Sequence, residues 1–357
     1  MKKRIYSLDF LRIPAAMMIV MHHFQQAFSA FFPNHINYFG GRFSFGYVVE
    51  FFFVLSGFLM LPAVRKIYSG EVGFGEFAFR RARRLLPMLA VCALAYDAVE
   101  VISWAQSGFG KPLNISLLMT VADMLGIQSG WCFQTAEINT PSWYACVLLL
   151  CYVLLFALVR LCARKRWQVE YACVGTVLLG CGVFSFGFEL PFLNYASSRG
   201  FYSFFFGVLV SLLNEKYDLQ KPKYRVISLT MLLFAVFDIL RGRGSGFLIA
   251  FFVSPALIQI FTGETAQKIF SGRVWEKLGN IQFHVYLWQA AILNFMYVLA
   301  DAGIKLNVYS PMAMYAFAVF MEAFGALSYF LLEKRADRIF MSLLPERRQT
   351  QQAESAL

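Results

Sequence analysis

The feature that most constrains this chain is a series of apolar runs, each about 17 to 22 residues long, that recurs along its 357 residues. A helix of that length matches the hydrocarbon thickness of a bilayer. The chain is 59% hydrophobic and 15% charged, whereas soluble domains carry about 25% charged residues. A transmembrane β-barrel would instead show alternating segments of about ten residues, which the sequence lacks. These patterns predict an all-α polytopic membrane protein.

We predict about ten transmembrane helices in one bundle, with both termini cytoplasmic. Lysine and arginine collect in cytoplasmic loops, so their distribution tests this topology. Of 32 such residues, 25 fall on the inner side, 6 on the outer side, and Arg12 lies in the membrane. The net charge of +11 follows from this topology and does not predict a nucleic-acid partner. The predicted spans are 8–31, 45–64, 85–105, 142–162, 169–190, 199–214, 226–241, 246–262, 281–300 and 311–332.

Three segments need separate treatment. The basic start followed by an apolar run resembles a signal peptide, but charged residues and two histidines interrupt that run, so we expect a retained first helix. Residues 115–128 are apolar but short, and we predict a re-entrant or interfacial helix on the outer side. Residues 1–335 form the predicted membrane domain, and residues 336–357 form a polar cytoplasmic tail.

The cysteines show no metal-ligand spacing, and we expect no metal site. Six of the seven lie inside apolar runs, where cysteine behaves as a small buried hydrophobe. These six are Cys92, Cys146, Cys151, Cys162, Cys173 and Cys181, and the seventh is Cys132.

Ionisable residues in the first predicted helix are the first candidates for chemistry. His23 follows Arg12 by eleven residues, which places it roughly 16 Å deeper and within about 20° of the same helix face. Asp9 precedes Arg12 by three residues and can neutralise it. Buried ionisable residues in a membrane are functional candidates, and histidine exchanges a proton near neutral pH. His22 points away from that face, and we expect it to contact a neighbouring helix or lipid.

Two further groups of charged residues accompany this helix. Glu50 lies in the second span at roughly the depth of His23, where a carboxylate could hold the imidazole tautomer. A plain structural ion pair is the alternative for Glu50. The segment FRRARRLLP at 79–87 carries Arg80, Arg81 and Arg84, and arginines suit phosphate binding at a cytosolic opening. Ordinary inner-side charge or contact with anionic lipid is the alternative for these arginines.

The order of these motifs resembles that of the membrane acyltransferase family 3. The shared features are R-x10-H, VEFFFVLSGF at 49–58, the RR-x-x-R-L-x-P pattern, PSWYACVLLLCY at 141–152, RGFYSFFFGVLV at 199–210 and LGNIQFHVYLWQ at 278–289. The resemblance covers roughly residues 6–335. Three positions depart from the family pattern: Leu148 replaces an acidic residue of some members, Gln282 replaces serine, and Gln289 replaces the commoner histidine.

The resemblance implies an enzyme that moves an acyl group, usually acetyl, from cytosolic acyl-CoA to a hydroxyl of a cell-surface glycan or lipid-linked saccharide. Arg81 and Arg84, with Arg80, would hold the CoA phosphates. His23 would deprotonate the acceptor hydroxyl or transiently carry the acyl group. Arg12 would contact the CoA arm or polarise the thioester carbonyl. The implied location is a bacterial inner membrane, with membrane lipid as a partner.

Residues nearer the outer side could contact the acceptor. Trp143 opens a helix after a proline, although with Tyr144 it also fits an ordinary interfacial aromatic pair. Arg199 lies on the outer side, where positive charge is sparse, and could reach a sugar or lipid phosphate. Tyr286 and Gln289 could supply polar contacts within the bundle. We expect the neighbouring His284 to have a structural role.

Other classes of protein remain possible for this sequence. A transporter or flippase of a small molecule or lipid-linked sugar would also place Arg, His and Glu in the membrane. That class predicts inverted repeats, and none is visible. A non-catalytic membrane sensor would tolerate loss of His23. A glycosyltransferase using a lipid-linked sugar would show paired acidic residues on an outer loop, and none is convincing.

The predicted topology can be tested by labelling single cysteines introduced into a cysteine-free variant. A cysteine at position 83 is expected to react from the cytoplasmic side only, because the basic cluster around it should stay inside. A membrane-impermeant maleimide applied to intact and to permeabilised cells makes the measurement. Labelling of position 83 in intact cells would invert the topology.

Overall fold

In the computed structural model, residues 4–29, 42–108, 110, 113, 115–132 and 139–342 are described. A helix coincides with each of the ten predicted spans. Among the described residues, six helices are long and apolar enough to cross a membrane, or seven if one bent pair counts as one span. The all-α membrane class is therefore confirmed, while the number of ten spans stays a prediction.

The first half of the chain begins with a helix, a short irregular turn and two successive helices before the longest helix of the fold. Its elements are α1 (Tyr6–Ala27), β1 (Phe43–Ser44), η2 (Phe45–Val48), α3 (Val49–Phe58), α4 (Leu61–Ser69), α5 (Phe74–Gln106), α6 (Leu117–Met124), η3 (Gln128–Cys132), η4 (Thr140–Ser142), α7 (Trp143–Lys165) and α8 (Val169–Phe186).

The second half is also helical and includes two π-helical turns. Its elements are α9 (Tyr195–Tyr217), α10 (Pro222–Leu240), α11 (Gly246–Leu248), η5 (Ile249–Val253), α12 (Ser254–Phe261), α13 (Glu264–Ile269), α14 (Arg273–Asp301), α15 (Pro311–Ser328), η6 (Tyr329–Glu333) and α16 (Lys334–Ser342).

The second predicted span is broken rather than continuous. The helix through α3 ends at Phe58, and α4 begins at Leu61 with a bend of 43° between them. Pro62 occupies the start of α4, where its fixed φ angle and missing N–H group are tolerated. The break lets α4 turn towards α7, so the second half of this predicted span leaves the direction of α3.

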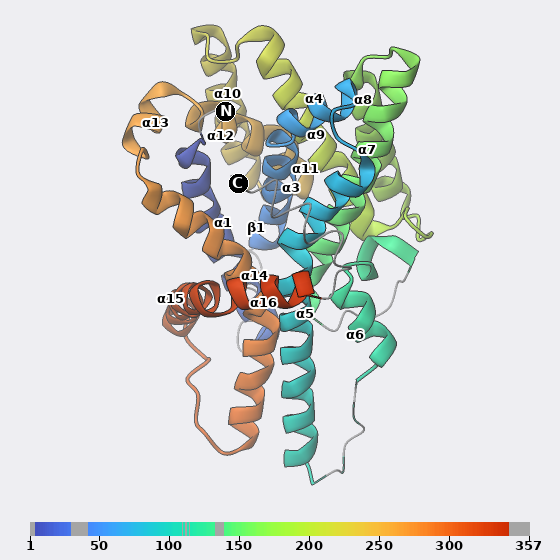
Figure 1. The fold of residues 1–357 in the computed structure, drawn as a ribbon. Coiled ribbons are helices and arrows are strands. Elements are labelled where there is room, and N and C mark those ends of the chain that lie inside the picture. Colours follow the sequence, from blue (N-terminus) through green and yellow to red (C-terminus); the bar gives the residue numbers. More distant parts are fainter. Residues whose placement is uncertain are drawn as a thin grey trace.

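Helix α9 lies at the centre of the larger core and packs against α3, α7 and α8 (Figure 1). Glycines permit its close approach to α3. A Cβ atom added at Gly207 would overlap the carbonyl oxygen of Val54, and one added at Gly57 would overlap that of Phe204. Such reciprocal small residues let two helix backbones approach closely in a membrane, where dispersion contacts drive helix association.

A second core joins the first helix to the end of the chain. Buried side chains of α1, α14 and α15 form it, with Phe24, Val285 and Met321 among its members. Figure 1 shows α5 and α14 extending together to one end of the molecule, with α15 and α16 lying across them. This arrangement holds α1 against α14, and the candidate site lies between these helices and α3, α5 and α7.

Two predicted segments can be compared with short helices. The segment 115–128 contains α6, whose eight residues span only about 12 Å and cannot cross a bilayer. The predicted tail beginning at residue 336 instead starts inside α16, which continues as helix to Ser342. Asp337 accepts two hydrogen bonds from Arg83 of α5 at 2.6 and 2.7 Å, which fixes α16 against the bundle. Residues 343–357 lie outside the described part of the chain.

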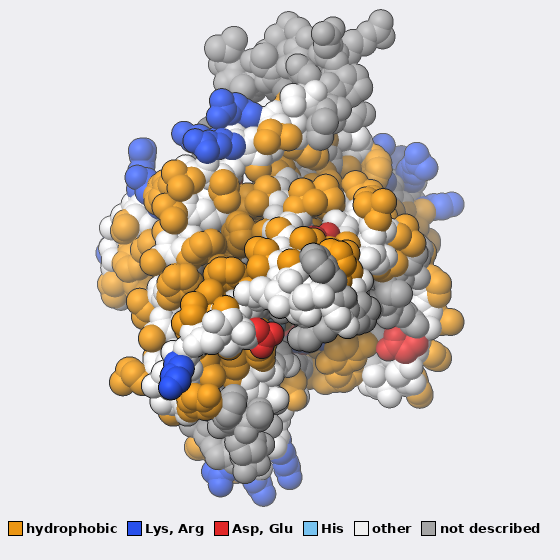
Figure 2. All heavy atoms as spheres, turned by 90° about the horizontal axis from the view of Figure 1, so that it is seen from below, with side chains coloured by type: hydrophobic (Ala, Val, Ile, Leu, Met, Phe, Trp, Pro, Cys, Tyr) orange, Lys and Arg blue, Asp and Glu red, His pale blue; other side chains and the backbone are white. Residues whose placement is uncertain are grey.

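The surface agrees with a membrane environment. Figure 2 views the end of the molecule at which α5 and α14 finish, and hydrophobic side chains dominate that face. Leu117, Leu178 and Leu233 are among the large apolar residues that are more than 60% exposed. Five of the six cysteines predicted to be buried are so, whereas Cys181 is half-buried. The side chain of Cys132 lies outside the described residues.

The close approach of α3 and α9 gives a stability prediction. Gly207→Ala is expected to lower the melting temperature in detergent by several degrees, because the added methyl group overlaps Val54 and must push the backbones apart. The matched control is Gly175→Ala in α8, where nothing lies within 4 Å of the added atom. The control should keep or raise stability, since alanine favours a helix over glycine by about 1 kcal/mol. Equal melting temperatures for the two variants would contradict the packing described.

Candidate active site

A cavity of about 710 Å³ opens among α1, α3, α4, α5, α7 and α14. One part of its wall is polar and comes from the predicted cytoplasmic ends of the helices. The deeper wall is largely apolar and aromatic, and includes Phe52, Leu55 and Tyr144. This volume is within the range of small-molecule sites, which are commonly apolar with a few polar groups. The polar residues lining the cavity include Arg4, Asp9, Arg12, Arg84, Asn280 and Glu333.

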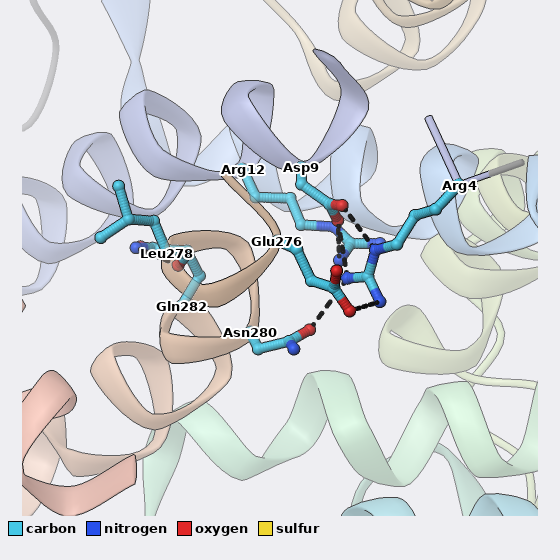
Figure 3. Close-up of polar contacts among 7 residues, drawn as sticks. All are labelled: Arg4, Asp9, Arg12, Glu276, Leu278, Asn280 and Gln282. Carbon is cyan, nitrogen blue, oxygen red and sulfur yellow. Dashed lines mark hydrogen bonds and ion pairs between the residues drawn. The ribbon is translucent and has the colours of Figure 1, made fainter. Parts of the chain in front are cut away.

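Asp9 connects two arginines at the polar end of the cavity. Its carboxylate accepts hydrogen bonds from Arg12 at 2.9 Å and from Arg4 at 2.8 and 3.2 Å. The expected Asp9–Arg12 pair is therefore confirmed. Figure 3 shows the Arg4 guanidinium group reaching from Asp9 to Glu276 and Asn280 of α14. Burial lowers the pKa of Arg4, but the hydrogen bond and charge of Asp9 raise it above the ordinary value, so Arg4 stays charged.

His23 contacts α14 rather than α3. Its Nδ1 atom lies 2.6 Å from the side-chain Oε1 of Gln289, and its ring centroid lies 6.5 Å from that of Tyr286. Because an amide oxygen only accepts, this contact assigns the proton to Nδ1 and leaves the Nε2 lone pair available as a base. Tyr286 also lines the cavity, so one aromatic side chain connects the cavity wall to His23.

The expectation that Glu50 holds the His23 imidazole is wrong. Glu50 is 1% exposed and its carboxylate accepts hydrogen bonds from Arg199 at 2.6 and 2.8 Å and from the Tyr202 hydroxyl at 2.9 Å. The depth of Glu50 in the membrane follows from its sequence position, but α3 is rotated so that Glu50 faces α9. The structural ion pair left open by the sequence is the arrangement found, and Gln289 provides the contact to His23.

Arg199, which binds Glu50, also lies over the ring of Trp143. The Arg199 guanidinium carbon lies 4.8 Å from the Trp143 ring centroid and 5.7 Å from that of Tyr195. Its side chain is 12% exposed and paired with Glu50, and a contact with a sugar or lipid phosphate stays a prediction. Tyr144 is buried rather than interfacial, and its hydroxyl lies 3.0 Å from the Ser56 hydroxyl.

His22 faces a neighbouring element, as predicted. Its side chain is buried, and the imidazole lies against Gly46 of η2, where an added Cβ atom would be 2.6 Å from Nε2. The carbonyl oxygen of Gly46 also accepts a hydrogen bond from Arg199 at 3.2 Å. His22 therefore packs beside the Glu50–Arg199 pair, whereas His23 faces α14.

The three arginines of α5 that were predicted to bind phosphate occupy different places. Arg84 lines the main cavity and is exposed. Arg81 lies between the rings of Phe77 and Tyr152, at 5.3 and 5.2 Å from their centroids, and lines a separate pocket of about 190 Å³. Arg80 also borders that pocket and forms an exposed ion pair with Glu76. The predicted phosphate-binding group is thus divided, and only Arg84 faces the main cavity.

Two residues of these networks were missed in the sequence. Arg4 was counted only as inner-side charge, although its position five residues before Asp9 allowed a contact across the helix start. Tyr202 follows Arg199 by three residues, which places both on one face of α9 and could have indicated a shared partner. Among the described residues, no group of three His, Cys, Asp or Glu side chains could hold a metal ion.

Comparison with known proteins gives a family match and curated relatives that agree with each other. The family model described as "Acyltransferase domain" matches residues 5–330. Two curated relatives carry the name "Putative O-acetyltransferase", one from Staphylococcus aureus strain COL and one from strain MSSA476. Each is 21% identical over 85% of this chain and 53% of its own length, so the chain spans about half the length of these relatives. No solved structure matches the chain.

The buried Glu50–Arg199 pair gives a second stability prediction. Removing one partner of a buried ion pair leaves an uncompensated charge and costs about 3–5 kcal/mol. We therefore expect Glu50→Gln and Arg199→Met each to lower the melting temperature strongly, and the double variant to lose much less than the sum. Thermal unfolding in detergent measures both.

The exposed pair Arg80–Glu76 provides the matched control. Its side chains are 57% and 52% exposed, and Glu76→Gln should cost less than about 1 kcal/mol. Strictly additive losses for Glu50→Gln and Arg199→Met, or an equal loss from Glu76→Gln, would show that the buried pair does not stabilise the fold.

Proposed function

Because the chain belongs to this acyltransferase family, we propose that it is a membrane-embedded O-acyltransferase that uses cytosolic acyl-CoA. The acyl group proposed is acetyl, and the proposed acceptor is a hydroxyl of a cell-surface glycan or lipid-linked saccharide. The proposed setting is a bacterial inner membrane, with ten spans and cytoplasmic termini. The observation that carries the proposal is the cavity, which begins among arginines and continues to Tyr286 beside His23.

The polar end of the cavity supports a phosphate-bearing donor. Arg84 lines it, and guanidinium groups bind phosphate oxygens through charge-assisted hydrogen bonds. Arg4 lines it too but is already paired with Asp9 and Glu276. Arg12 lines the same cavity and is already neutralised by Asp9, which suits contact with the neutral arm or the thioester carbonyl better than a second phosphate. The apolar wall around Phe52 and Leu55 fits the hydrocarbon parts of the arm.

His23 supplies the base in the proposed reaction. Its Nε2 takes the proton of the acceptor hydroxyl while the hydroxyl oxygen attacks the thioester carbonyl carbon. The new C–O bond forms, the C–S bond breaks, and the thiolate of CoA leaves with the electron pair. The proton held by His23 then neutralises the thiolate. A route through an acyl group on His23 would use the same nitrogen atom, and in either route a positive group near the carbonyl oxygen, such as Arg12, stabilises the developing charge.

Gln289 and Glu50 have separate supporting roles in this proposal. Gln289 accepts from Nδ1 and keeps the basic nitrogen of His23 directed away from α14. Glu50 joins α3 to α9 through Arg199, which fixes the wall that carries Phe52 and Ser56. Glu50 is thus proposed to position the site and not to exchange a proton.

The adjacent histidines provide the test of the proposed function. His23→Ala should insert normally and lose acyl transfer by about 10²-fold or more, as expected for a lost general base. His22→Ala should keep most activity, because His22 packs against Gly46 away from the cavity. Transfer of label from acetyl-CoA is measured in membranes with matched protein levels. Loss of activity in His22→Ala with retention in His23→Ala would reverse the assignment, and full activity in both would favour a transporter or sensor.

A further inference from the structure

A histidine other than His23 lies in the cavity wall and has no part in the reaction described above. His284 is 1% exposed and lines the cavity together with Glu333. It occurs on α14 four residues after Asn280, which binds Arg4, and five residues before Gln289, which binds His23. At about 1.5 Å per residue, His284 therefore lies between the polar end of the cavity and His23.

A chain of hydrogen bonds fixes the imidazole of His284. The indole Nε1 of Trp288 donates to the Ser328 hydroxyl oxygen at 2.7 Å, and this oxygen lies 2.9 Å from Nδ1 of His284. Indole nitrogen is a donor only, so Ser328 accepts from Trp288. The Ser328 hydroxyl keeps its own hydrogen and can donate it to His284 Nδ1. The remaining proton of the neutral imidazole is then on Nε2.

Glu333 lies near Nε2 of His284 but beyond hydrogen-bonding distance. Its Oε2 atom lies 3.9 Å from His284 Nε2, which is too far for a direct hydrogen bond. Ser328 directly precedes the π-helical turn η6, and Glu333 is its last residue. Hydrogen bonds between residues five apart place these two side chains on the same helix face, and π-helical turns often occur at functional sites. The turn thus brings one partner to each nitrogen of His284.

A donor and an acceptor at this separation fit one shared oxygen atom. An oxygen about 2.8 Å from each atom can accept from Nε2–H and donate to the carboxylate, which a hydroxyl group can do. The pantetheine arm of coenzyme A carries a hydroxyl group between its pyrophosphate and its amides. We propose that His284 and Glu333 bind the hydroxyl of this arm and so set how far the thioester reaches towards His23; this inference rests on the proposed use of acyl-CoA.

The test compares the binding of two ligands, so that contacts with the pantetheine arm can be distinguished from contacts with the phosphates. Coenzyme A carries both, whereas adenosine 3′,5′-bisphosphate carries phosphates without the arm. Binding of each to the purified full chain is measured by competition with labelled acetyl-CoA. His284→Phe should weaken coenzyme A about tenfold, as expected for a lost hydrogen bond, and leave the bisphosphate unchanged.

His284→Gln is the variant that separates binding from packing. Its amide retains an N–H donor and should recover most of the affinity, although phenylalanine preserves the ring shape better. The inference would be overturned by any of three results: unchanged coenzyme A affinity in His284→Phe, equal losses in both variants, or equal losses for both ligands. Unchanged affinity is also the result expected if water alone bridges His284 and Glu333. Absence of acetyl transfer by a wild-type protein that binds coenzyme A would reject only the proposed function. A wild type that binds neither ligand would reject both.

Discussion

The structure depends on giving each charged side chain within the helices a partner, because water is scarce there and an unpaired charge is costly. Asp9 neutralises Arg12 and also binds Arg4, and Glu50 neutralises Arg199. Asp9 thereby joins α1 to the segment before it, and Glu50 joins α3 to α9. Arg84 differs from these arginines because it is exposed at the cavity. The pairing therefore leaves positive charge at the position where an anionic donor would enter.

Glycine residues shape the site as well as the core. A Cβ atom added at Gly279 of α14 would overlap Asp9, and one added at Gly246 would overlap the Glu50 carboxylate. Gly46 contacts the His22 imidazole. At each of these positions a larger side chain would displace a polar group that belongs to the networks around the cavity. Small residues therefore allow backbones to approach polar side chains closely, which replaces some of the solvation that water would provide.

Much of the fold could be predicted from the sequence because hydrophobic periodicity and basic residues report directly on membrane helices. The spacing of Asp9 and Arg12 also predicted their ion pair, since residues three apart are neighbours on a helix. Pairing between helices was less predictable. The sequence predicted the depth of Glu50, but its direction depends on the rotation of α3 about its axis, which the packing of Gly57 and Gly207 sets.

Contacts between helices were also hard to predict for the arginines of α5 and for residues near helix ends. Arg81 and Arg84 are three residues apart, yet aromatic rings hold Arg81 beside a separate pocket while Arg84 faces the cavity. The contact of His23 with Gln289 joins residues 266 positions apart, and no local pattern encodes it. The π-helical turn that places Ser328 and Glu333 around His284 likewise has no sequence signal that was recognised.

In the proposed function, the acyl donor enters the cavity from the cytoplasmic side past Arg84. The most direct measurement supplies labelled acetyl-CoA, which does not cross membranes, to sealed inside-out and right-side-out vesicles. This entry route predicts labelled saccharide or lipid only in inside-out vesicles. The rate at limiting acetyl-CoA should fall about tenfold in Arg84→Ala and stay nearly unchanged in Arg80→Ala. Equal labelling in right-side-out vesicles, or a larger effect of Arg80→Ala than of Arg84→Ala, would contradict it.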